Sequence, residues 1–161
     1  MSTSAGPSAG SIEARLARAG LPPLPRLAWI EVDQHALAHN LRQIGALVGR
    51  NVVLAPVVKA DGYGHGIEVA ARAFLAGGAH RLCVATLDEA VALRTAGVTD
   101  VPIIVLFALA PDLVTTAVEA DLELVAADEA SVADTLAVWR SSGRGQAGTL
   151  RLHLEVETGL A

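Results

Sequence analysis

Short apolar runs alternate with longer stretches of helical periodicity along most of the chain. The apolar runs are rich in valine, leucine and isoleucine, which is typical of strands buried in a sheet. The helical stretches carry apolar residues three or four positions apart, so these residues fall on one stripe. Strands are predicted at 27–33, 51–59, 81–85, 101–107, 122–126 and 150–157, and helices at 34–48, 67–78, 87–97, 112–120 and 129–143. Repeated strand–helix units predict an α/β fold with a parallel sheet and right-handed crossovers.

Four of the predicted helices begin at residues that suit a helix N-terminus. Asp33 and Asp128 each precede a helical stretch and can cap it with a side-chain oxygen. Thr86 and Glu89 are three residues apart and match a capping box. Pro111 suits the first turn of the next helix, where its missing N–H leaves nothing unpaired.

The repeated units fit two architectures. From residue 51 onward the chain offers five strands with four helices between them. A doubly wound sheet can be complete with five strands, whereas a (β/α)8 barrel needs eight strands and about 250 residues. The strand count alone favours the smaller fold. The last predicted strand, 150–157, has no helix after it, so we expect the chain to be part of a larger fold.

Composition and charge narrow the class of partner. The formal net charge is −5, which gives no basic surface for nucleic acid or for an anionic membrane. A small molecule is therefore the expected partner. The longest strongly apolar run, 101–110, is too short to span a bilayer, and the single cysteine, Cys83, fits a reducing cytoplasm. Residues 1–26 are small, polar and rich in proline, and we predict a disordered leader there.

The stretch "VVKADGYGHG" at 57–66 carries the clearest chemistry. Lys59 ends a predicted strand, and both α/β architectures place their sites at that end of the sheet. The amine of Lys59, next to the apolar residues Val57 and Val58, is the kind of group that can form a Schiff base with the aldehyde of pyridoxal phosphate. Tyr63, in the glycine-rich loop that follows, could hydrogen-bond a phosphate. The alternative is an exposed lysine before an ordinary glycine turn, and the residues alone leave both open.

The same stretch resembles the pyridoxal-phosphate lysine motif of the alanine racemase family. "AWIEVDQHALAHNLRQI", "CVATLDEAVALRTAGV" and "LHLEVETGLA" resemble further parts of that family, in the same order. The resemblance implies that residues 27–161 are the N-terminal part of a (β/α)8 TIM barrel, with about five of its eight strands and without the family's C-terminal β domain. It also implies that Lys59 carries the cofactor and acts as one of two bases, and that Tyr63 binds the cofactor phosphate.

The activity implied by the resemblance is the interconversion of L- and D-alanine, which supplies D-alanine for peptidoglycan. The family's enzymes are cytoplasmic homodimers, and the second base is a tyrosine from the partner subunit's β domain. The 161-residue chain alone is therefore expected to be inactive and poorly folded. Two alternatives stay open: a racemase of the same class that acts on serine or on a wider range of amino acids, and a non-catalytic module that binds pyridoxal phosphate. No metal site is expected.

One glutamate near the end of the chain, Glu155, differs from the family's pattern. Family members commonly have a lysine at position 155, often carbamylated, whose negative group faces an arginine that would follow directly after Ala161. Here the residue is Glu155, with Glu157 beyond it. Both glutamates share a strand face with Arg151 and His153, because the four alternate with leucine and valine. We expect this face to line the barrel, with Glu155 supplying the charge of the carbamate; the alternative is a solvated edge strand.

Overall fold

The computed structural model describes residues 10–24, 30–142 and 149–159. The chain divides into two compact units, residues 1–32 and 33–161. The second unit begins six residues later than the predicted start of the main domain at residue 27. None of the helices in the described ranges is both long and apolar enough to cross a membrane.

The first unit contains helix α1, Ile12–Arg18, where a disordered leader was predicted. Ser11 caps this helix, because its Oγ accepts a hydrogen bond from Ala14 N at 3.3 Å. The structure thus describes a helix within part of the segment predicted as a disordered leader, since an N-cap followed by good helix formers suffices for a local turn. The rest of the predicted leader at 1–9, 25 and 26 lies outside the described residues.

The predicted strand at 27–33 does not form where it can be checked. Residues 30–32 have no strand pairing, and residues 27–29 lie outside the described residues. Glu31 instead pairs with Arg15 within the first unit, with Glu31 Oε2 and Arg15 Nη1 2.6 Å apart. An extended apolar run becomes a strand only where a partner strand lies beside it, and the first unit holds none in its described part.

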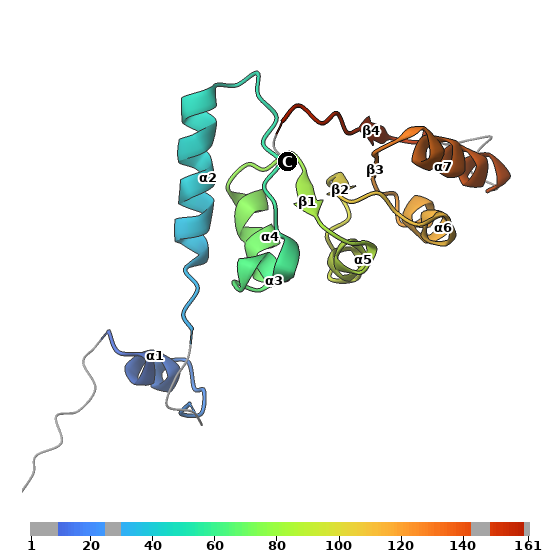
Figure 1. Cartoon of the computed structure of the whole chain (residues 1–161). Coiled ribbons are helices and arrows are strands. Elements are labelled where there is room, and N and C mark those ends of the chain that lie inside the picture. Colours follow the sequence, from blue (N-terminus) through green and yellow to red (C-terminus); the bar gives the residue numbers. More distant parts are fainter. Residues whose placement is uncertain (1–9, 25–29, 143–148, 160–161) are drawn as a thin grey trace, which may run out of the picture. The chain divides into compact units, whose positions relative to one another are not determined.

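The second unit alternates helices and short strands (Figure 1). Its helices are α2 (Gln34–Val48), α3 (Lys59–Tyr63), α4 (Ile67–Ala76), α5 (Leu87–Thr95), α6 (Pro111–Glu119) and α7 (Glu129–Ser141). Its strands are β1 (Leu82–Val84), β2 (Ile103–Val105), β3 (Leu124–Ala126) and β4 (Leu152–Leu154). The predicted helix starts at Asp33, Thr86, Pro111 and Asp128 are all confirmed.

The strands pair in parallel and in sequence order. β1 pairs with β2 and β3 with β4, and an isolated bridge between Ile104 and Glu123 links the two pairs. The predicted strand at 51–59 is reduced to one bridge, between Val57 and Cys83. The fold is therefore α/β with consecutive parallel strands, and the sheet stays open within the part of the chain that the structure describes.

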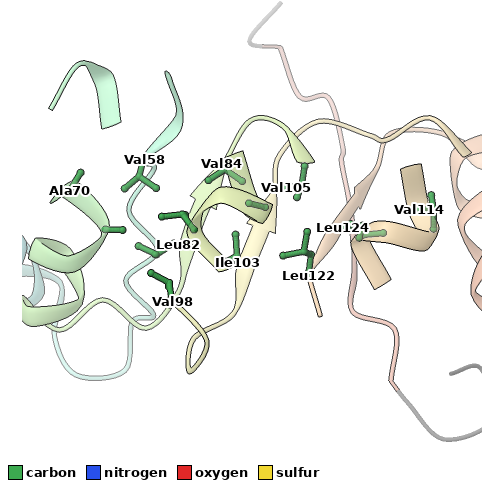
Figure 2. Packing of buried hydrophobic residues seen from close by; sticks show 14 residues of the cluster. Val58, Ala70, Leu82, Val84, Val98, Ile103, Val105, Val114, Leu122 and Leu124 are labelled. Carbon is green, nitrogen blue, oxygen red and sulfur yellow. The ribbon is translucent and has the colours of Figure 1, made fainter. Parts of the chain in front are cut away.

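One face of this sheet is buried by helices (Figure 2). Val58 and the alternating residues of β1, β2 and β3 form one apolar cluster with small and branched side chains of α4, α5 and α6. The strand members of this cluster are Leu82, Val84, Ile103, Val105 and Leu124. Successive strand residues point to opposite faces, so the residues between them point away from the helices.

Candidate active site

Lys59 lies where the first paired segment of the sheet ends. Val58 N donates to Cys83 O at 2.8 Å and Cys83 N donates to Pro56 O at 2.9 Å, which ties this segment to β1. Lys59 follows directly, at the edge where the carboxyl ends of the parallel strands meet. It is half-buried, and it is the only lysine in the 161-residue sequence. Within these 161 residues, any chemistry that needs a side-chain amine therefore depends on Lys59.

An aromatic ring from the segment after β2 lies beside the amine. Lys59 Nζ is 5.7 Å from the centre of the Phe107 ring, close enough for a cation–π attraction. Phe107 is 60% exposed, so its ring is accessible beside the amine. Sequence reasoning missed this residue, although an aromatic residue at the C-terminal end of the predicted strand 101–107 is a signal that could have found it.

The residues after Lys59 form a left-handed turn rather than an ordinary helix. Ala60, Asp61, Gly62, Tyr63 and Gly64 all have positive φ, between 51° and 87°. Each non-glycine residue in this conformation costs about 1–2 kcal/mol. A run of five such residues forms only where surrounding contacts compensate for that strain.

Hydrogen bonds within the motif hold this turn in place. Gly62 N donates to Val58 O at 2.9 Å, and Asp61 Oδ1 accepts from Ile67 N at 2.8 Å, at the start of α4. Gly62 is buried, and a Cβ there would lie 3.0 Å from the Cβ of Ala70. Glycine at 62 therefore serves both the positive φ and the close approach of α4.

Tyr63 lies on the same turn as Lys59, and the structure thus brings these two predicted site residues together. The Tyr63 side chain is 60% exposed, so its phenol is available to a ligand. Gly64, next to it, has φ +87°, and a Cβ at this position would meet no heavy atom within 4 Å. The turn therefore offers open backbone beside an exposed phenol, which suits the approach of a phosphate.

Glu89 joins the site from α5, and its part was not foreseen. The capping box with Thr86 was predicted, and it is present. In addition, Glu89 Oε1 accepts a hydrogen bond from Ala60 N at 2.7 Å. No sequence pattern signals this contact, because the two residues are 29 positions apart.

Glu155 and Glu157 lie beyond β4, in another part of the sheet from the Lys59 turn. Glu155 is exposed, and its backbone N donates to Ala126 O at 3.0 Å, continuing the pairing of β3 with β4. Glu157 is also exposed, and its Oε1 accepts from Gly159 N. The structure thus brings neither glutamate into the turn that holds Lys59 and Tyr63.

A buried carboxylate organises the sheet face that points away from the helices. Glu123 is 1% exposed, and both of its oxygens accept from Arg81 Nη1. His153 Nε2 lies 2.8 Å from Glu123 Oε2, and Arg151 Nε lies 3.2 Å from Oε1. The prediction that Arg151 and His153 share a face is therefore confirmed. Their common partner was not foreseen.

Cys83 lies on the same face, in surroundings that disfavour the reactive thiolate form. Burial raises the pKa of the Cys83 thiol, the negative charge of Glu123 raises it further, and Arg81 partly opposes this. The thiol Sγ is 3.6 Å from Ala55 O. The prediction of a packed thiol without a catalytic part agrees with this environment.

Sequence and structure comparisons identify the family. The family model described as the N-terminal domain of alanine racemase matches residues 32–161. The chain belongs to the alanine racemase family. It is 41% identical over 132 residues to the alanine racemase of Desulforamulus reducens. The aligned region covers 82% of this chain and 34% of that protein.

Solved structures of the family agree with this result. The crystal structure of alanine racemase from E. faecalis matches with a TM-score of 0.73 and 34% identity, covering 80% of this chain and 34% of that one. A histidine racemase from Leuconostoc mesenteroides subsp. sake matches with a TM-score of 0.65 and 30% identity, covering 74% of this chain and 30% of that one. The chain spans about a third of the length of these family members.

Proposed function

We propose that this chain is the N-terminal part of an alanine racemase that uses pyridoxal phosphate to interconvert L- and D-alanine. One observation carries the proposal: the only lysine of these 161 residues directly precedes a left-handed, glycine-containing turn, at the edge where parallel strands end. The similarity to alanine racemases supports the same interpretation. The product D-alanine would supply peptidoglycan synthesis in the cytoplasm, where the free thiol of Cys83 is stable.

We also propose that residues 33–161 form the first five units of a (β/α)8 TIM barrel. The parallel pairing in sequence order and the helices on one face of the sheet support this architecture. The polar face that holds Glu123 would then point into the barrel. This span is slightly shorter than the predicted 27–161, because the compact unit begins at Asp33.

The residues of the Lys59 turn fit pyridoxal phosphate. Lys59 supplies a half-buried amine for the aldehyde, Phe107 lies next to that amine, and Tyr63 offers an exposed phenol four residues along the turn. When bound, pyridoxal phosphate withdraws electrons from the substrate α-carbon and so makes its hydrogen acidic.

Lys59 and Tyr63 would then contribute to different parts of the reaction. Lys59 would hold the cofactor through its side-chain amine, and the same amine would accept or return a proton at the substrate α-carbon, on one face of the substrate. Racemisation needs a second acid–base group on the opposite face. Tyr63 is the only tyrosine of the sequence and is assigned to the phosphate, so we propose that the second group comes from outside these 161 residues, in a homodimer.

Tyr63→Phe tests the phosphate contact. A hydrogen bond to a charged group is worth about 1.5–3 kcal/mol, so we expect the affinity for pyridoxal phosphate to fall about tenfold to a hundredfold. Absorbance titration of the cofactor-free gene product measures this affinity. The kcat at saturating cofactor should change far less. An affinity within twofold of the unaltered protein would remove Tyr63 from the phosphate site.

Glu155 is proposed to supply the negative charge that a carbamylated lysine supplies elsewhere in the family. Its exposure beyond β4 leaves the carboxylate accessible to a cationic partner. We expect Glu155→Gln to lower kcat/KM about tenfold, or about 1.4 kcal/mol, and the unaltered enzyme to be insensitive to bicarbonate. A Glu155→Lys variant that exceeds the unaltered enzyme, and does so only with bicarbonate, would instead mark Glu155 as a damaged position.

Racemisation assays on the complete gene product test the function and its alternatives. We expect kcat/KM to be highest for L-alanine among L-alanine, L-serine and L-histidine, with circular dichroism as the readout. The similarity to a histidine racemase makes L-histidine the informative competitor. A protein that binds pyridoxal phosphate but racemises none of the three would be the non-catalytic module.

A further inference from the structure

The segment before Lys59 pairs with β1 as a regular parallel ladder. Arg81 N donates to Leu54 O at 3.2 Å, and Cys83 N donates to Pro56 O at 2.9 Å. In the other direction, Val58 N donates to Cys83 O at 2.8 Å. In a regular ladder the bonds continue at every second residue. The next rung would join Ala85 N to Val58 O and Ala60 N to Ala85 O.

That next rung is absent because the chain turns left-handed at Ala60. Val58 O accepts instead from Gly62 N at 2.9 Å, inside the turn. The turn therefore takes the acceptor that Ala85 N would have used, and it carries Ala60 N away from its strand partner. Two backbone donors, Ala60 N and Ala85 N, would therefore have no acceptor in the paired strands at the point where Lys59 leaves the sheet.

The carboxylate of Glu89 supplies both acceptors. Its Oε1 accepts from Ala60 N at 2.7 Å, and its Oε2 accepts from Ala85 N at 2.8 Å and from Thr86 N at 3.3 Å. We infer that Glu89 is the positioning residue of Lys59: its carboxylate replaces the missing rung and thereby holds the left-handed turn that presents the lysine. This inference rests on the proposed function, in which Lys59 binds the cofactor.

The strain of the turn gives this contact a specific role. Ala60 and Asp61 lie in the left-handed region without the freedom of glycine, and Ala60 is the first residue of the run. Relaxing Ala60 to an extended conformation would restore the ladder and remove the strain. The bond from Ala60 N to Glu89 opposes this change, so it fixes the direction in which Lys59 leaves the strand.

Helix α7 has a serine, Ser131, at the position that Glu89 occupies in α5, and this serine only caps its helix. Ser131 Oγ accepts from Ala127 N at 3.1 Å and from Asp128 N at 3.0 Å, the same backbone positions that Glu89 Oε2 contacts before α5. The short serine thus suffices to cap a helix after a strand of this sheet. The greater length of glutamate at position 89 is used to reach across to Ala60.

This comparison provides the variant and its control. Glu89→Ser in the complete gene product keeps a cap of the α7 type but cannot reach Ala60, whereas Ser131→Ala weakens a cap far from Lys59. Hydrogen exchange of residues 60–66 measures how stably the turn is formed. The rate at which borohydride fixes pyridoxal phosphate to Lys59 measures how well the lysine is positioned. The thermal midpoint measures the stability of the whole fold. In Glu89→Ser we expect exchange to rise and the rate of covalent capture to fall, each by about tenfold or more.

Ser131→Ala should leave exchange at 60–66 and capture at Lys59 unchanged, even where it lowers the thermal midpoint. Glu89→Gln has one acceptor oxygen in place of two and should give intermediate values, which a general loss of stability would not reproduce. It also replaces Glu89→Ser if that variant does not fold. Unaltered exchange and capture in both Glu89 variants would overturn the inference.

The two readouts separate this inference from the proposed function. Hydrogen exchange needs no cofactor, so it tests the Glu89 contact even if the unaltered protein captures no pyridoxal phosphate. In that case the proposed function fails, while faster exchange in Glu89→Ser still supports the structural part. If the unaltered protein and Glu89→Ser capture pyridoxal phosphate equally well, the proposed function is supported. Glu89 then has no part in positioning Lys59.

Discussion

Lys59→Arg is expected to abolish covalent capture of pyridoxal phosphate and to reduce racemisation by roughly a thousandfold or more, the scale of a lost acid–base group. Arginine keeps the positive charge and the attraction to Phe107. Its guanidinium stays protonated, however, and cannot form the bond to an aldehyde that an amine forms. The change therefore isolates the chemistry of the amine from the charge at this position.

The control for this prediction is a measurement that the variant keeps its fold. The thermal midpoint of Lys59→Arg should stay close to that of the unaltered protein, because Lys59 is half-buried at the edge of the sheet. Absorbance at the violet end of the visible spectrum measures covalent capture of pyridoxal phosphate. Chiral analysis of the product measures racemisation. Racemisation at even a tenth of the original rate would show that Lys59 is not the essential amine.

Glu123→Ala is expected to cost about 1.5–3 kcal/mol of unfolding free energy, because it removes the hydrogen bonds of a buried carboxylate to partly exposed charged partners. Arg81, Arg151 and His153 all face this carboxylate, and Glu123 is 1% exposed. The carboxylate joins the strands on the face that points away from the helices. Urea unfolding of the gene product measures the change.

Glu68→Ala provides the matched control. Glu68 pairs with Arg72 four residues further along α4, at 2.8 Å, with both side chains about half-exposed. Such a pair is worth about 0.3–0.5 kcal/mol and weakens with salt. If Glu123→Ala costs no more than Glu68→Ala, the buried cluster does not stabilise the sheet.

Local features were predicted best because neighbouring residues determine them. The caps at Asp33, Thr86 and Asp128 each depend on side chains within three or four positions of a helix start. The strand at 51–59 was predicted too long, since its pairing depends on β1 and on the turn that interrupts the ladder at Ala60. Periodicity alone carries neither piece of information.

The candidate site was predicted only in part for the same reason. The motif pointed to Lys59 and Tyr63, and its glycines indicated a turn. The positive φ of Ala60 and Asp61 was not foreseen, because residues of these types rarely adopt it. Glu89 and Glu123 act on residues 29 and 42 positions away, so only the folded chain shows their part.

Peptide mass spectrometry after borohydride reduction tests the central claim most directly. The complete gene product is incubated with pyridoxal phosphate, reduced and digested. Because Lys59 is the only lysine among these 161 residues, the modified side chain is unambiguous there. We predict that the peptide containing Lys59 carries the reduced pyridoxyl phosphate group. Bound cofactor in a protein whose Lys59 peptide stays unmodified would contradict the account.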